Sequence, residues 1–429
     1  MKKDNDISLL AKVILFFRGI RDKIASIKLF EKISKRQKAL SSYKGKSSSE
    51  ESKISYVLGI AKVISATLLA VLLLVTVLFG SGVISYEKVY YMFKDISYIK
   101  SFEEGSPSSL NYSRPVQNQT FDNFKNGLLV ASDSEVKLFT STGRVTLITG
   151  SEMVNPRVSS SGGYALIYDQ GRKSFSVYNS FVKLYSEHTE YPIALADMAD
   201  SGEFLIVTSS AKYSSVVKIY TTDFKLRSEY SKNDRVISAS LSENGRYAAI
   251  VSLSAEDGAA KVTLNVLDCQ KDKIVSETVL SGSMPYTCKF LTNDRIAIIF
   301  DNRACVLSRD GKTIGEYTYS SELERMDIDG DKIALLFSEK RGEDNKSLII
   351  LDSACSKTFS TVVNGNVRDL ELSGGYVYVL QSKEVIRIGT ALGIKTEKEV
   401  NVDTTNLVAL DDGRVIACSQ ASGSYISFD

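Results

Sequence analysis

A chain of 429 residues is long enough for two or three average domains or for one large repeat domain. The formal net charge of +2 conceals an asymmetry, because residues 1–53 hold 14 Lys and Arg against 6 Asp and Glu, and the remaining residues carry a net negative charge. A hydrophobic segment separates the basic region from the acidic body, which favours sorting across a membrane and argues against nucleic-acid binding.

The first 54 residues are predicted to form a basic cytoplasmic region. Within it, residues 7–30 place apolar side chains along one helical face and Lys and Arg over much of the rest. This pattern predicts an amphipathic helix that lies on an anionic lipid leaflet or docks a partner, although a short helix that packs on nothing in particular also fits it. Residues 41–53 form a polar, Ser-rich spacer.

A transmembrane segment is predicted next, because residues 63–86 contain no charged side chain. About 20 residues at about 1.5 Å each span the hydrocarbon core. We assign residues 55–86 to an uncleaved signal anchor; the alternative, a cleaved signal peptide, has a small-x-small site at Gly80-Ser81-Gly82, but its leader would exceed the usual length. The basic flank predicts a cytoplasmic N-terminus and an extracytoplasmic body, so the lipid bilayer is an expected partner.

Residues 121–429 are predicted to fold as an all-β, eight-bladed β-propeller. A strand, a tight turn and a second apolar strand recur at intervals of 36 to 49 residues, the period of a four-stranded blade. The turn residues are Gly127, Gly163, Gly202, Gly245, Asp294, Gly330, Gly375 and Gly413. Seven blades is the alternative if Phe121–Gly150 is partly irregular.

The eighth unit lacks an outer strand, since the chain reaches Asp429 after three strands. A closed propeller does not tolerate the bare sheet edge that this leaves. The segment over residues 87–120 is therefore predicted to be a juxtamembrane linker that supplies the closing strand, and Asp95–Phe102 (DISYIKSF) is the stretch that we assign to it.

The blade pattern S-x-x-G-x-Y/F followed by apolar residues, seen at Ser159–Tyr164 and Ser242–Tyr247, resembles the broad WD40-like and quinoprotein-like propeller superfamily. With the anchor, it is more closely similar to an uncharacterised bacterial family of signal-anchored propellers, over roughly residues 55–429. The resemblance implies an architecture and transfers no catalytic residues. The chain has no Trp, so it lacks the Trp-Asp dipeptide of WD40 repeats and the tryptophan docking motifs of quinoprotein dehydrogenases.

The residue inventory argues against most catalysis and against a metal or other cofactor. The single histidine, His188, is predicted to be a solvated loop residue, and His₂ or His₃ metal sites are excluded. Met326–Asp331 places carboxylates at alternate positions, but its Gly falls in the wrong register for a calcium loop, so a hairpin turn is predicted. The five cysteines are predicted to be mostly buried strand residues, with a Cys288–Cys305 disulfide left open.

The predicted inner strands bring four aspartates near the propeller axis: Asp122, Asp197, Asp327 and Asp369. Hydrogen bonding to neighbouring blades is the favoured interpretation. The alternative is an extracytoplasmic glycan hydrolase or lyase that uses channel carboxylates.

Binding residues are predicted in the three longest loops between second and third strands, at 209–215, 252–260 and 338–347, because long loops on one rim of a repeat scaffold commonly carry recognition. The candidates are Lys212, Tyr213, Glu256, Asp257, Lys340, Arg341, Glu343 and Asp344. The function predicted is a non-catalytic, membrane-anchored extracytoplasmic propeller that binds a protein or cell-envelope partner as a scaffold or sensor. The alternative is that these loops are tolerated surface insertions that bind no partner.

Overall fold

The computed structural model describes residues 62, 65–67, 109–112, 118–256, 258–338 and 344–428. Lys62 and residues 65–67 are helical, and the strands all lie beyond them. The predicted amphipathic helix at 7–30 and nearly all of the predicted membrane segment at 63–86 lie outside the described residues. Among the residues that are described, no helix has the length and apolar character needed to cross a membrane.

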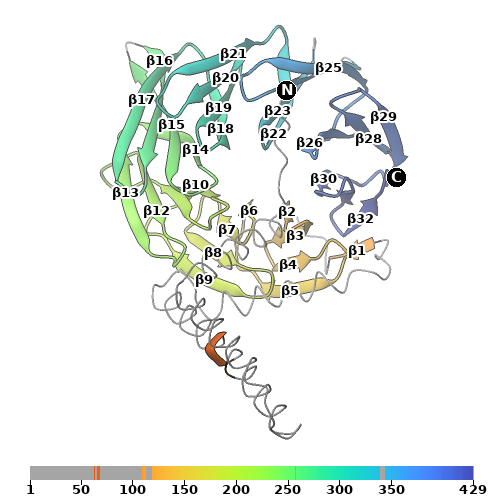
Figure 1. Ribbon diagram of the computed structural model, residues 1–429, viewed down its shortest axis with the longest axis horizontal. Coiled ribbons are helices and arrows are strands. Elements are labelled where there is room, and N and C mark those ends of the chain that lie inside the picture. The colour runs from red at the N-terminus through yellow and green to blue at the C-terminus, as the bar shows by residue number, and fades with distance from the viewer. Residues whose placement is uncertain are drawn as a thin grey trace, which may run out of the picture. The chain divides into compact units, whose positions relative to one another are not determined.

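Eight antiparallel sheets of four strands each follow one another around a ring, so the chain is an eight-bladed β-propeller (Figure 1). The eight-bladed prediction is confirmed, because Phe121–Gly150 forms a regular blade of its own. The blades are numbered one to eight here in the chain order of their innermost strands. The inner strands are β2 (Gln119–Phe124), β6 (Pro156–Ser160), β10 (Ile193–Met198), β14 (Arg235–Leu241), β18 (Pro285–Thr292), β22 (Glu322–Asp329), β26 (Asp369–Ser373) and β30 (Asn406–Ala409).

The other three strands of each blade follow outward from the axis. The second strands are β3 (Gly127–Ser132), β7 (Ala165–Asp169), β11 (Phe204–Thr208), β15 (Tyr247–Glu256), β19 (Arg295–Phe300), β23 (Lys332–Ser338), β27 (Tyr376–Leu380) and β31 (Val415–Cys418). The third strands are β4 (Glu135–Phe139), β8 (Ser174–Tyr178), β12 (Ser215–Tyr220), β16 (Ala259–Asp268), β20 (Arg303–Ser308), β24 (Asn345–Leu351), β28 (Glu384–Gly389) and β32 (Ser422–Ile426). The outer strands are β5 (Val145–Gly150), β9 (Lys183–His188), β13 (Leu226–Lys232), β17 (Lys273–Ser281), β21 (Thr313–Thr318), β25 (Lys357–Asn364), β29 (Lys395–Glu399) and β1 (Ser109–Asn111).

The hydrophobic pattern of each strand follows from its place in the blade. The second strands are continuous apolar runs, as in β3, where every residue is buried, because neighbouring blades cover both faces of the sheet. Outer strands such as β9 alternate between exposed and half-buried residues. The core is accordingly divided into eight apolar clusters, one at each interface between blades; Leu264, Phe290 and Ile298 belong to the cluster between blades four and five.

The eighth blade is closed by β1, which pairs antiparallel with β32 in the register Leu110↔Gly423. A strand from before the first blade therefore supplies the missing edge, but the assignment to Asp95–Phe102 is wrong. The reason is packing: Leu110 fits the apolar interface between blades eight and one. β1 also lies only a few residues before β2 in the chain, and short connections between consecutive elements are the usual ones.

The closure is reinforced by contacts that cross from blade eight to blade one. The ring of Tyr112 lies 5.7 Å from that of Phe121, centroid to centroid, and also packs over Gly423, where an added Cβ would come within 2.6 Å of the tyrosine oxygen. The Lys137 Nζ donates to the Asn111 carbonyl over 3.0 Å, and the Tyr425 hydroxyl donates to the Thr140 carbonyl over 2.9 Å. The three-residue strand is thus anchored on both sides.

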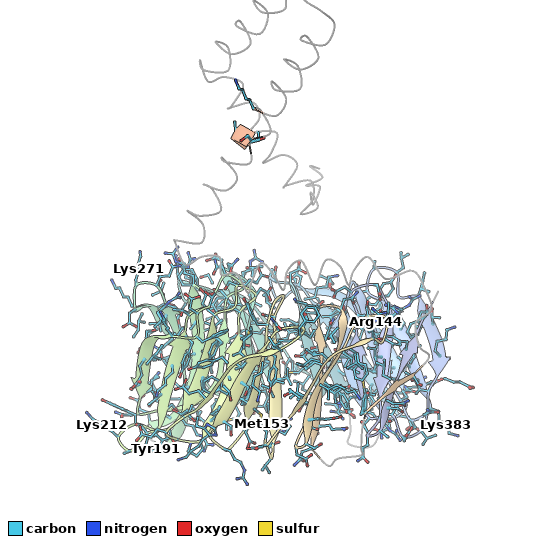
Figure 2. The ribbon with its side chains drawn as sticks, turned by 90° about the horizontal axis from the view of Figure 1, so that it is seen from below. Arg144, Met153, Tyr191, Lys212, Lys271 and Lys383 are labelled. Atoms are coloured by element: carbon cyan, nitrogen blue, oxygen red, sulfur yellow. The ribbon has the colours of Figure 1, made fainter. Side chains whose placement is uncertain are left out.

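The propeller has two faces that differ in their connections. One, the turn face, carries the tight turns between first and second strands and between third and fourth strands, and Lys271 lies on it (Figure 2). The other, the loop face, carries the connections between second and third strands and between blades; Met153, Tyr191, Lys212 and Lys383 lie there. Because Asn111 pairs with Ser422 at the start of β32, β1 runs from the turn face toward the loop face.

If β1 closes the ring, Leu110→Ala destabilises the propeller. Leu110 is 1% exposed, and truncating a buried leucine to alanine costs about 2–5 kcal/mol. The matched control is Leu392→Ala, whose side chain is 81% exposed. We expect a thermal midpoint lowered by several degrees for the first variant and unchanged for the second, measured by circular dichroism. Equal midpoints for the two variants would show that β1 contributes nothing to closure.

Candidate functional site: the central channel and the loop face

A relay of hydrogen bonds runs around the axis from blade three to blade seven. In each step, a side chain on one inner strand forms a hydrogen bond with the backbone of a residue on the next inner strand. The residue just before that contacted residue then supplies the side chain for the next step, so that Asp197 contacts Leu241 and Ser240 makes the following bond. The bonds are Leu241 N to Asp197 Oδ2 (2.7 Å), Phe290 N to Ser240 Oγ (3.5 Å), Lys289 Nζ to the Ile328 carbonyl (2.7 Å) and Leu372 N to Asp327 Oδ2 (2.7 Å).

The remaining interfaces are bridged in the same way near the axis. These bonds are Leu407 N to Asp369 Oδ2 (2.8 Å), Asn123 Nδ2 to the Ala409 carbonyl (2.9 Å), Ser160 Oγ to the Asn123 carbonyl (2.8 Å) and Met198 N to Ser159 Oγ (3.0 Å). Each of the eight blade interfaces therefore has at least one side chain to backbone bond around the channel.

The favoured interpretation of the axial aspartates is confirmed for three of the four. Asp197, Asp327 and Asp369 each accept a hydrogen bond from the backbone N–H of the next blade. Burial raises the pKa of all three carboxyl groups, and these hydrogen bonds act in the opposite direction. Burial also raises the pKa of Asp122, against a hydrogen bond with the Ser160 side chain.

Glu371 is the channel residue that the sequence analysis missed. Glu371 directly precedes Leu372, so its side chain is in the position from which the relay would continue to blade eight. The bond to blade eight comes from Asp369 instead, and among the described residues the Glu371 side chain has no hydrogen-bond partner. Burial raises the pKa of the Glu371 carboxyl well above its usual value, and the charges of Asp327, Asp369 and Asp122 raise it further. The sequence does contain a signal for Glu371. The inner-strand sequence DLELS has acids at alternate positions, as does the corresponding sequence RMDID of blade six.

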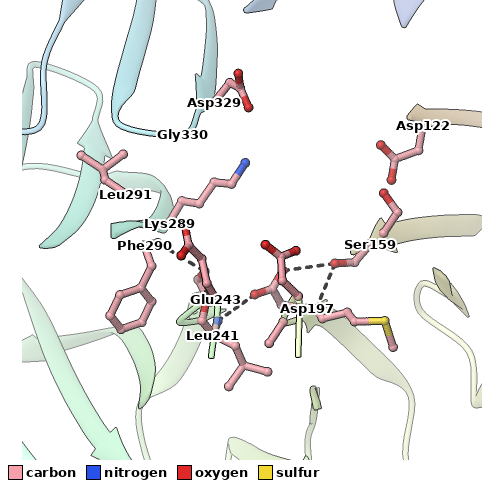
Figure 3. Close-up of a pocket in the computed structure, with 15 residues that line it drawn as sticks. Asp122, Ser159, Asp197, Leu241, Glu243, Lys289, Phe290, Leu291, Asp329 and Gly330 are labelled. Carbon is pink, nitrogen blue, oxygen red and sulfur yellow. Dashed lines mark hydrogen bonds between the residues drawn. The ribbon is translucent and has the colours of Figure 1, made fainter. Parts of the chain in front are cut away.

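A cavity of about 470 Å³ opens in the channel toward the turn face (Figure 3). Lys289 extends into it, with Asp329 and Asp197 on either side. The cavity is lined by Asp122, Ser159, Ser160, Asp197, Met198, Ala199, Asp200, Ser240, Leu241, Glu243, Lys289, Phe290, Leu291, Asp329 and Gly330. One ammonium group therefore shares this space with several carboxylates.

Two of the predicted binding residues lie together on the loop between β11 and β12. The Lys212 side chain is exposed, and its Nζ is 5.1 Å from the centroid of the Tyr213 ring. The loop is held by Ser210, whose Oγ accepts the backbone N–H of Tyr213 over 2.9 Å. This loop is therefore a defined turn that presents a cation and an aromatic ring.

The segment 252–260 differs from the prediction, since most of it is strand. The ladder of β15 and β16 continues to the pair Glu256↔Ala259, so the connection is only the dipeptide Asp257-Gly258. An Asp-Gly pair with Gly258 at φ +79° is typical of a tight hairpin turn, and this sequence signal was overlooked. Glu256 is exposed on the hairpin, and its carboxylate lies 2.6 Å from Lys261 Nζ.

The other predicted binding residues are only partly described. Asp257, Lys340, Arg341 and Glu343 lie outside the described residues. Asp344 is exposed next to the start of β24, and its carbonyl accepts the Gly365 N–H over 2.6 Å. The loops that carry Lys212, Glu256 and Asp344 belong to blades three, four and six and share the loop face.

The remaining chemical candidates have structural explanations. His188 is the exposed last residue of β9, where it pairs with Ser174, and so is not on a loop as predicted. The five cysteines are buried and unpaired, so Cys288 and Cys305 form no disulfide. Asp329 ends β22 and Lys332 begins β23, which confirms a hairpin turn at the calcium-like sequence. In the described part of the chain, no three His, Cys, Asp or Glu side chains are grouped as metal ligands.

The comparisons with known proteins agree with the fold. The sequence model of a family of unknown function (DUF5711) matches residues 99–426. None of the curated proteins compared with the chain matches it significantly. Among solved structures, BamB from Moraxella catarrhalis is similar with a TM-score of 0.50 and 14% identity, over 75% of this chain and 97% of that one. The C-terminal WD40 domain of Sif2 is similar with a TM-score of 0.51 and 11% identity, over 76% and 98%. At such identities the likeness concerns the fold alone.

The crowded channel predicts that Glu371→Gln stabilises the propeller at neutral pH. A carboxyl group whose pKa is raised on folding contributes stability below its unfolded pKa, and this contribution is lost as pH rises through the folded value. The amide keeps the shape without the charge. We expect a midpoint roughly 2–4 °C higher than that of the unaltered chain at pH 8, with a smaller difference near pH 5.

The measurement is thermal unfolding across this pH range, with the exposed outer-strand variant Glu397→Gln as the control for the loss of one charge. The idea of a repulsive, unpaired carboxylate is refuted if Glu371→Gln lowers the midpoint at pH 8.

Proposed function

We propose that this chain, which belongs to the family of unknown function DUF5711, is a non-catalytic propeller that is anchored in the cell membrane and binds a protein or cell-envelope partner on its loop face. The observation that carries the proposal is the composition of that face. At the start of blade five, Met284 and Tyr286 are 44% and 50% exposed. Met and Tyr are enriched at protein interfaces, and they are side chains that a monomer otherwise tends to cover.

Charged groups flank this apolar site. Glu256 is the last residue of β15, in the hairpin of blade four, and Asp344 lies in the connection between β23 and β24 of blade six. The two residues therefore belong to the blades on either side of blade five. The Met284 backbone is fixed by two hydrogen bonds with Asp301. An apolar centre with a charged rim is the usual anatomy of a recognition surface.

The direction of the chain supports the choice of face. Ser109 lies at the turn-face end of β1, and β32 also ends toward the turn face. Ser109 and Ile426 therefore both lie toward the turn face, at the opposite end of their strands from the loop face.

The alternative function, cleavage of a glycan by a hydrolase or lyase reaction that uses the channel carboxylates, has less support. Asp197, Asp327 and Asp369 accept backbone N–H bonds that join blades. A general acid or nucleophile at these positions would have to exchange those bonds during turnover. We therefore assign the three carboxylates a structural role.

The membrane anchor rests on the uncharged segment 63–86 behind a basic leader. The buried native cysteines make its orientation measurable, because a membrane-impermeant maleimide reaches only an introduced, exposed thiol. We expect Lys212→Cys to be labelled on intact cells and Ser47→Cys, in the basic leader, only after permeabilisation. The reverse pattern would overturn the proposed orientation, and labelling of both variants on intact cells would overturn the anchor.

Partner binding is tested by site-specific photo-crosslinking from the loop face. A photoreactive residue at Lys212 is expected to capture a defined, saturable adduct, whereas one at Lys271 on the turn face is not. Tyr286→Ala is expected to reduce capture about fivefold, because truncation of an interface aromatic commonly costs more than about 1 kcal/mol. The exposed turn residue Leu392 provides the control, Leu392→Ala.

Equal capture from both faces, or no effect of Tyr286→Ala, would contradict recognition by the loop face. Turnover of a cell-wall glycan that is lost in Asp122→Asn would instead favour the hydrolase or lyase.

A further inference from the structure

Arginine side chains recur on the inner strands near the loop face, where these strands begin. Arg157 is the second residue of β6, Arg235 is the first of β14, and Arg325 lies in the first half of β22. Arg368 directly precedes β26. The four arginines therefore come from blades two, four, six and seven, and they are distributed around the channel that the inner strands surround (Figure 1).

The four guanidinium groups are accessible to a ligand. Three of them are exposed, and Arg368 is half-exposed. The faces of an inner strand are covered by neighbouring blades and one edge is bonded to the second strand, so an exposed side chain on it faces the channel or its loop-face mouth. No hydrogen bond or ion pair joins Arg235 or Arg325 to another of the described residues.

The other two arginines are held in place by uncharged groups. Arg157 Nε donates to the Gln170 side chain over 3.1 Å, and the Gln170 amide donates to the Ala194 carbonyl of blade three over 3.0 Å. Arg368 donates to the Thr404 carbonyl, in the connection to blade eight, over 3.0 Å. A guanidinium that is already oriented loses less entropy when it binds a carboxylate, and Arg157 keeps both terminal amino groups for that purpose.

The acids near this end of the inner strands are fewer, and most of them already have partners. Glu324 is ion-paired within blade six, and the Asp369 carboxylate accepts the Leu407 N–H over 2.8 Å. Glu322 is exposed at the start of β22. Carboxylates such as Asp329, at the end of β22, lie toward the turn face instead. The loop-face mouth therefore has a surplus of positive charge, which favours an anionic ligand.

A recurrent β-bulge is a second feature of the same end of the channel. In four consecutive blades, three to six, the inner strand has one extra residue near its start, and a bulge of this kind commonly re-aims a side chain at a rim. The extra residues are Ala194, Ile237, Tyr286 and Glu324. The first three are exposed or half-exposed, so they form an apolar arc over blades three to five, between Arg157 and Arg325.

The distribution of these groups indicates what kind of anion fits. Blades two and six lie on opposite sides of an eight-bladed ring, so the positive charges surround the mouth. A chain that carries several carboxylates matches this distribution better than one small anion does. The apolar arc distinguishes further, because a polyphosphate has no apolar group to cover it and an uncharged glycan leaves the guanidinium groups without partners.

We propose that the loop-face mouth of the channel binds an extended acidic peptide segment of a protein partner. Its carboxylates pair with the arginines, which can each offer two parallel N–H donors, and its apolar side chains pack on the arc of Ala194, Ile237 and Tyr286. The inference rests on the proposed function of the loop face and names the chemistry of the partner.

The test is fluorescence anisotropy of the full-length chain, in a nonionic detergent, with a labelled peptide of alternating glutamate and leucine. The matched probe is the same peptide with glutamine in place of glutamate. We expect the glutamate peptide to bind at least about tenfold more tightly, and its affinity to fall as the salt concentration rises, because salt screens exposed ion pairs.

Arg235→Gln and Arg325→Gln are each expected to weaken binding of the glutamate peptide about fivefold and to reduce its salt dependence, because each variant removes one charged partner. Tyr286→Ala is expected to weaken binding by a similar factor without changing the salt dependence. Lys271→Gln removes one positive charge from the exposed turn face and is expected to leave the affinity unchanged (Figure 2). Circular dichroism of each variant confirms that the fold is retained.

The inference is overturned if neither peptide binds, if both bind equally, or if Arg235→Gln and Lys271→Gln have equal affinity. Tighter binding of polyphosphate than of the glutamate peptide would mean an anionic envelope polymer instead. Capture of a partner from Lys212 without binding of the glutamate peptide would reject the acidic segment and leave the proposed loop-face function in place, whereas failure of both experiments would reject the two together.

Discussion

Closure of the ring is the constraint on which the rest of the structure depends. A single four-stranded sheet with apolar residues on both faces is not stable alone, because each face must be covered by a neighbouring sheet. Seven blades supply all four of their strands from one continuous stretch of chain, and the eighth borrows β1. Leu110 and Tyr112 are therefore important for stability although they are only two residues, since they complete the apolar cluster between blades eight and one. A short strand suffices because its side chains reach both blades.

The axis imposes a second requirement. The inner strands converge there, and their polar groups need partners that their own sheets do not provide. The relay from Asp197 to Leu372 meets the need by using each inner-strand side chain to satisfy the backbone of the next blade. Buried carboxylates are costly, so each accepted N–H bond offsets part of its desolvation. Glu371 breaks the relay, and this makes it the most informative residue in the channel.

The exposed apolar side chains and the polar cavity lie at opposite faces of the propeller. The loop face presents exposed Met284 and Tyr286 with charged connections on either side, which suits a macromolecular surface. The cavity near the turn face is small and polar, and several carboxylates surround Lys289 in it. The connection that carries Met284 lies on the loop face, which is opposite to the end at which β1 begins.

The sequence alone predicted eight blades, because eight glycine or aspartate turns recur along the chain, and the regular sheet of β2 to β5 excluded the alternative of seven. It also predicted that the axial aspartates bridge the blades, because inner-strand positions follow from the period, and Asp197, Asp327 and Asp369 do so. The tertiary structure decided which strand closes the ring: DISYIKSF has the stronger strand pattern, but Leu110 fits the interface. It likewise revealed the unpaired carboxylate of Glu371, since the absence of a partner is a property of three-dimensional neighbours that no local pattern encodes.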